Sequence, residues 1–79
     1  MIDVRGWSWV INTKDMTCKS VENEVIIKME RDGKNLKAIL YDMPIWLFAE
    51  ISGYGDGVKI IEEIIRTAGE KYLGSHTQA

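Results

Sequence analysis

The dipeptide Asp32-Gly33 constrains the fold of this chain more than any other feature of the sequence. A two-residue hairpin turn of type I′ needs positive φ at both central positions, and Asp-Gly is a preferred pair there. With these residues as the loop, side chains on one face of the ribbon are apolar on both strands. The facing pairs are Met29–Leu36, Ile27–Ala38 and Val25–Leu40. Turn chemistry and side-chain alternation together predict a hairpin over residues 24–41.

The other face of this hairpin has a mixed character. The same register places Ile26 opposite Ile39 and Lys28 opposite Lys37, with Tyr41 near the end of the face. Two paired isoleucines beside a tyrosine indicate that another surface covers part of this face. That surface could be the loop of the first strand, a second copy of the chain or a ligand.

Two segments precede the hairpin. Residues 4–11 alternate, with Trp7, Trp9 and Ile11 on one side, and predict a first strand. The tryptophans suit a core lid, and a stacking platform for a base or sugar is the alternative. Residues 16–23 fit either a strand or a loop.

Two helices are predicted after the hairpin. Asp42 and Pro44 favour a helix start, and the helix then runs from Ile45 to Ile51. It is apolar almost all round, a pattern typical of burial from two directions. The second helix covers residues 58–73, ends at Gly74 and carries an unusually broad apolar arc.

We therefore expect an α+β fold: an antiparallel β-meander of about three strands, with hairpin 24–41 at its centre. Two C-terminal α-helices pack on one face. Residues 1–74 form one small domain, and residues 75–79 form a disordered tail. A chain of 79 residues builds a marginal core, and oligomerisation often supplements it. The surplus apolar surface predicts an interface that includes Trp46, Ile60, Ile64, Ile26 and Ile39.

The residues needed for catalysis or metal binding are sparse. Cys18 and His76 are the single cysteine and histidine, and they lie far apart in the sequence. Metal sites need several converging ligands, and nucleophilic catalysis needs a base beside the nucleophile. The glycine-rich residues 52–57 match neither the spacing of the Walker phosphate loop nor that of the dinucleotide-binding fingerprint. We therefore interpret them as a turn between helices. We expect no enzymatic activity, no metal and no cofactor.

From Leu36 onward, a strand, Pro44, a short helix, a glycine turn and EEIIRTAGEKYL follow one another. This order resembles ribbon-helix-helix repressors over about half of the chain. The resemblance implies a DNA-binding regulator in which Lys37, Ile39 and Tyr41 face the major groove. In that family, however, the strand pairs with a second subunit, whereas here residues 24–31 already pair with it.

Charge and hydropathy favour a protein partner. The chain contains ten basic and twelve acidic residues, so we expect no strongly basic surface for binding nucleic acid. No apolar run approaches the roughly 20 residues of a membrane span, and no signal peptide is visible. We expect a cytoplasmic, non-enzymatic interaction or assembly module that forms a homodimer or binds another protein, not nucleic acid or a membrane.

Overall fold

The computed structural model describes residues 3–77 and has the predicted α+β class. A short 3₁₀ helix, η1, comes first and is followed by four strands and two helices. In chain order these are η1 (Val4–Gly6), β1 (Trp9–Asn12), β2 (Thr17–Ser20), β3 (Ile26–Asp32), β4 (Asn35–Asp42), α1 (Ile45–Ser52) and α2 (Gly57–Thr77). The sheet has four strands where about three were expected.

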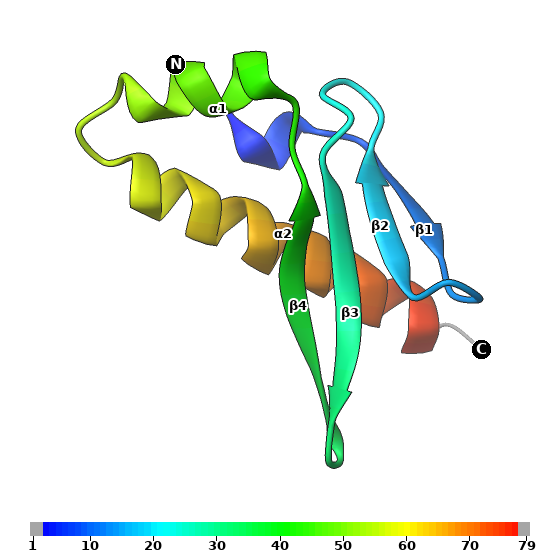
Figure 1. Ribbon diagram of the computed structural model, residues 1–79. Coiled ribbons are helices and arrows are strands. Elements are labelled where there is room, and N and C mark those ends of the chain that lie inside the picture. The colour runs from blue at the N-terminus through cyan, green and yellow to red at the C-terminus, as the bar shows by residue number, and fades with distance from the viewer. Residues whose placement is uncertain (1–2, 78–79) are drawn as a thin grey trace.

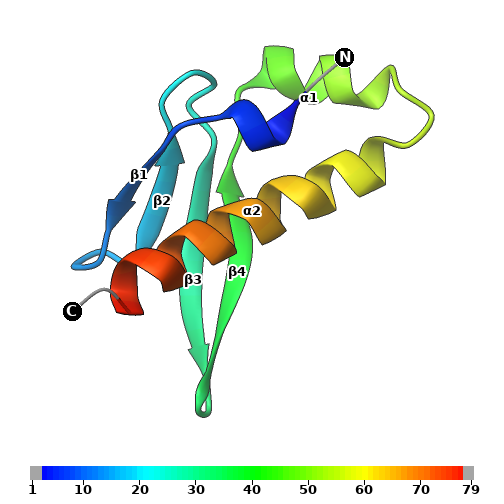
Figure 2. The same cartoon turned by 180° about the vertical axis from the view of Figure 1, so that it is seen from behind.

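The sheet is an antiparallel meander whose spatial order, β1-β2-β3-β4, is the order in the chain. Helix α2 runs diagonally across one face of the sheet (Figure 2). Helix α1 packs against α2 at the end of the sheet (Figure 1). No other described element covers the opposite face, which we call the open face.

The β3–β4 hairpin has the predicted faces but not the predicted register. Gly33 and Lys34, rather than Asp32 and Gly33, form the turn, and Asp32 pairs with Asn35. Gly33 has a φ of +65°, and Lys34 has no positive φ. This pattern fits a type II′ turn, in which glycine occupies the first central position. The predicted type I′ turn is therefore wrong.

The cross-strand pairs from Ile27 to the turn are consequently shifted by two residues, and an irregularity between Ile26 and Ile27 places Ile26 opposite Asp42 instead of Ile39. Met29 lies opposite Ala38, and Ile27 lies opposite Leu40. Because side chains alternate with a period of two, a shift of two leaves these residues on their predicted faces. The observed register also places Glu30, not Lys28, opposite Lys37. Opposite charges stabilise such a pair, whereas two facing lysines would repel each other.

The segment before the hairpin differs from the prediction at its start. Val4 belongs to η1 and is buried, and the first strand begins only at Trp9. The predicted turn is present, with Asn12 Oδ1 accepting a hydrogen bond from the Asp15 backbone N–H at 3.0 Å. The ambiguous residues 16–23 contain strand β2 followed by a turn.

Both helices form, with shifted ends. Pro44 is the N-cap of α1, and Asp42 lies in β4 instead of capping the helix. Helix α2 continues past Gly74 to Thr77, so most of the expected tail is helical. Gln78 and Ala79 lie outside the described residues.

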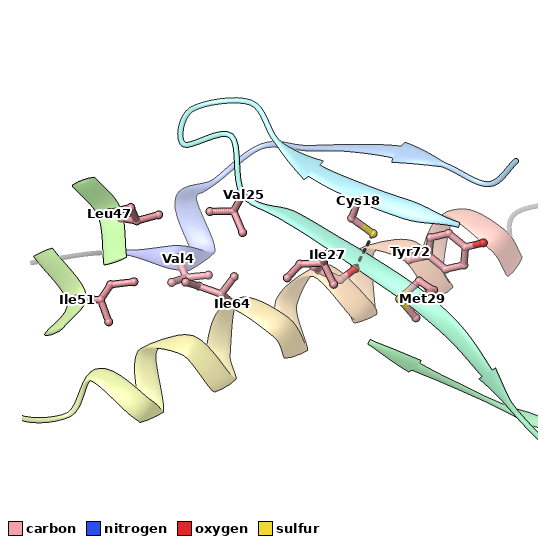
Figure 3. Packing of buried hydrophobic residues seen from close by; sticks show 10 residues of the cluster. Val4, Cys18, Val25, Ile27, Met29, Leu47, Ile51, Ile64 and Tyr72 are labelled. Carbon is pink, nitrogen blue, oxygen red and sulfur yellow. Dashed lines mark hydrogen bonds between the residues drawn. The ribbon is translucent and has the colours of Figure 1, made fainter. Parts of the chain in front are cut away.

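The core lies between the sheet and α2 and extends to α1 (Figure 3). Strand residues Ile27 and Met29 face α2 residues such as Ile64 and Tyr72. Val4 points toward Ile64 from η1. The buried apolar residues are Val4, Cys18, Val25, Ile27, Met29, Leu47, Ile51, Ile64, Ala68 and Tyr72.

Candidate functional site

Helix α1 carries three exposed large apolar side chains on only two helical turns. Ile45 is 86% exposed, and Trp46 and Phe48 are each 54% exposed. Leu47 and Ile51 occupy the other side of this helix and are buried. A helix of two turns thus fixes its position with two residues and leaves three large ones in solvent. We call Ile45, Trp46 and Phe48 the α1 surface.

The five predicted interface residues do not form one patch. Trp46 belongs to the α1 surface, and Ile60 on α2 is half-buried against the core. Ile64 is fully buried, so its assignment to an interface is wrong: η1 covers it within the same chain. Ile26 and Ile39 are half-buried and lie on the open face, one on β3 and one on β4.

The open face combines lysines with apolar side chains. Lys19, Lys28 and Lys37 project from β2, β3 and β4, and all three are exposed. Tyr41 is exposed as well. The Lys28 ammonium lies 5.6 Å from the centroid of the Tyr41 ring, which places Tyr41 on the same face. This contact is a cation–π interaction.

Lys37, Ile39 and Tyr41, the residues implied by the repressor resemblance, do share the open face. Their strand, however, is paired with β3 of the same chain along most of its length. In a ribbon-helix-helix dimer the corresponding strand pairs with the second subunit. The structure therefore places Lys37, Ile39 and Tyr41 on one face, but it does not show the strand pair between two subunits that the repressor family uses.

Trp7 and Trp9 lie on the side of the sheet that packs against the core. Both are partly buried, and their ring centroids are 6.0 Å apart with an interplanar angle of 43°. Their tilted rings pack against each other and the core, as expected for a lid over it. The Trp9 indole Nε1 is buried without a hydrogen-bond partner among the described residues.

A groove of about 600 Å³ lies between the tip of the β3–β4 hairpin and the end of α2. Its walls include the apolar residues Met16, Leu36 and Leu73 and the cationic residues Arg31 and Lys34.

No three histidine, cysteine or acidic residues lie close enough to hold a metal ion within the described part of the chain. None of the described helices is long and apolar enough to cross a membrane.

Cys18 is fully buried beneath α2, and its Sγ lies 3.5 Å from the backbone carbonyl oxygen of Ala68 (Figure 3). Burial raises the pKa of the Cys18 thiol from 9.0 to about 11. The thiolate is the reactive form of cysteine, so this environment disfavours nucleophilic chemistry. Cys18 is a packing residue.

This raised pKa predicts a loss of stability at alkaline pH. The unfolded thiol ionises near pH 9, whereas the folded thiol keeps its proton until about pH 11. Its contribution is therefore complete below pH 9 and is lost as the pH rises toward 11, by about 2–3 kcal/mol in total. The free energy of unfolding of the wild type and of Cys18→Ala should be measured by denaturant unfolding between about pH 8 and 11, a range that spans both pKa values. The difference between the two proteins at each pH gives the contribution of the thiol. Parallel pH profiles would contradict the prediction.

The chain matches no model of a known protein family, and no curated protein or solved structure is significantly similar to it. The arrangement of its own residues must therefore supply the functional argument.

Proposed function

We propose that this protein is a non-catalytic assembly module that forms a homodimer through the α1 surface. The exposure of Ile45, Trp46 and Phe48 on one short helix carries the proposal. Contiguous apolar patches on small proteins commonly mark protein contacts, and aromatic residues are enriched where such contacts are strongest.

The size of this surface suits the centre of an interface. A core aromatic side chain buries about 150–250 Å², so two half-exposed aromatics leave on the order of 200 Å² uncovered. Ile45 adds to this area. A standard interface buries about 800 Å² per partner, and in a two-fold dimer each copy supplies the same patch. The α1 surface would form the apolar centre, with the surrounding polar residues as a rim.

A second copy of the chain is the occupant that fits this surface best. Glu50 is the single charged residue of α1, so little on this helix would select an oppositely charged partner. An apolar helix face is complementary to its own two-fold copy. The small size of the chain also makes extra burial by dimerisation valuable, because such chains bury a low fraction of their surface.

The test is the solution mass by light scattering after size exclusion, over a wide range of protein concentration. The wild type is expected at twice the 9.0 kDa chain mass, and Trp46→Glu is expected at the mass of one chain. A charge placed in an apolar interface is left without a partner, which costs several kcal/mol.

Val10→Glu is the matched control. Val10 is 57% exposed, close to the value for Trp46, but lies on β1 at the far edge of the sheet. It should dimerise like the wild type. A wild type that stays monomeric at high concentration, or a Trp46→Glu variant that stays dimeric, would refute the proposed interface.

A further inference from the structure

The three lysines of the open face form a straight diagonal across the sheet. Lys28 pairs with Thr17 on β2, two residues from Lys19. On the other side Lys28 pairs with Ile39 on β4, two residues from Lys37. Residues related in this way on one face lie about 7–8 Å apart. We call Lys19, Lys28 and Lys37 the lysine row.

The lysine row is available to an external anion. None of its three ammonium groups forms an ion pair with a described residue, and all three side chains are exposed. Glu30 lies opposite Lys37 and reduces the potential at that end. At the other end Lys19 is next to Ile26, and two acidic residues, Glu24 and Asp42, line the same hollow as these residues. Acidic side chains therefore lie near both ends of the row, and its positive charge is strongest at Lys28.

Apolar and aromatic side chains border the row along one side. Ile26 and Ile39 flank Lys28 on this face, and Tyr41 presents its ring beside them. A row of cations next to an exposed aromatic ring is the combination by which proteins hold the phosphates and bases of single-stranded nucleic acid.

We propose that the open face binds a single strand of nucleic acid, with its phosphates along the lysine row. A base stacks on Tyr41, against the apolar surface of Ile39. Only an unpaired base can offer its flat face to this ring, because the bases of a duplex stack on one another. This proposal does not depend on the α1 surface, which belongs to a helix at the end of the sheet.

The number of cations sets the expected salt dependence. Each phosphate neutralised on a single strand contributes about −0.7 to the slope of log affinity against log salt concentration. Three lysines therefore predict a slope of about −2. A fourfold increase in salt should weaken binding about 20-fold.

The experiment is fluorescence anisotropy with labelled oligo-dT of about ten nucleotides, a length within the usual range of site sizes. Lys28→Gln should weaken binding several-fold and reduce the salt slope by about 0.7. Tyr41→Leu should weaken binding about fivefold or more at every salt concentration, because a stacked base contributes about 1–3 kcal/mol. Far-UV circular dichroism checks that each variant is folded.

Lys59→Gln is the matched control, since Lys59 is an exposed lysine on α2, on the opposite side of the sheet. It should bind like the wild type. Failure to bind at low salt, or equal losses in Lys28→Gln and Lys59→Gln, would overturn the proposal. Equal affinity for the dA·dT duplex would refute recognition of a single strand. Equal affinity for poly-L-glutamate would instead indicate an acidic protein as the occupant.

Discussion

Replacement of Ile64 by alanine is expected to lower the free energy of unfolding by about 2–5 kcal/mol. Ile64 is fully buried, and Val4 of η1 points toward it. The substitution removes buried methyl and methylene groups and leaves a cavity that the surrounding helices and sheet can fill only in part. Since small domains have only about 5–15 kcal/mol of stability, this loss is a large fraction of the total.

Ile60→Ala is the internal comparison for this prediction. Ile60 lies one helical turn earlier on α2, carries the same side chain and is only half-buried. Its replacement should cost clearly less than that of Ile64. Urea unfolding of both variants, monitored by tryptophan fluorescence, measures the two differences. Equal costs would contradict the assignment of Ile64 to the core and of Ile60 to its margin.

Leu47→Ala is expected to cost a similar 2–5 kcal/mol, whereas Phe48→Ala should change the stability of the isolated chain by no more than about 0.5 kcal/mol. Leu47 is buried, and its neighbour Phe48 is 54% exposed. The stability of Leu47→Ala and of Phe48→Ala should each be measured in the Trp46→Glu background. There the proposed dimer is absent, and unfolding does not depend on protein concentration.

The same pair separates folding from assembly. In the otherwise wild-type chain, Phe48→Ala should raise the dissociation constant of the dimer, because it removes an aromatic ring from the α1 surface. Sedimentation equilibrium measures this constant. If Phe48→Ala destabilised the isolated chain as much as Leu47→Ala, the exposed placement of Phe48 would be wrong.

The sequence predicts the element types well because hydrophobic periodicity is strong in both hairpin and helices. The faces of β3 and β4 are correct even though the turn was placed one residue early. An error of two in the pairing cannot be detected from alternation alone. The facing lysines in the predicted register carried the missing signal, since Lys28 opposite Lys37 is unfavourable and Glu30 opposite Lys37 is not.

The candidate surfaces were predictable only in part. The apolar character of α1 predicts that Trp46 lies at an interface; Trp46 is 54% exposed in the single chain, and the interface itself stays a prediction. The sequence misplaces Ile64 because the alternation of residues 4–11 predicts a strand, whereas Val4 belongs to η1, which covers Ile64. The lysine row cannot be predicted from the sequence alone, because the alignment of its three residues depends on the register of three strands. The net charge of the whole chain is −2 and gives no sign of a local cluster of lysines.

The strictly sequential order of the strands bears on how this chain folds during its synthesis. Every strand pairs with a neighbour in the chain, so the sheet needs only short loop closures and can form early. Helix α2, which buries the inner side chains of β2 and β3, follows all four strands. While the ribosome is still completing α2, Ile27 and Met29 on the inner face lack their cover. Exposed apolar strands of this kind promote aggregation. A nascent chain stalled before α2 should therefore be a preferred substrate for chaperones.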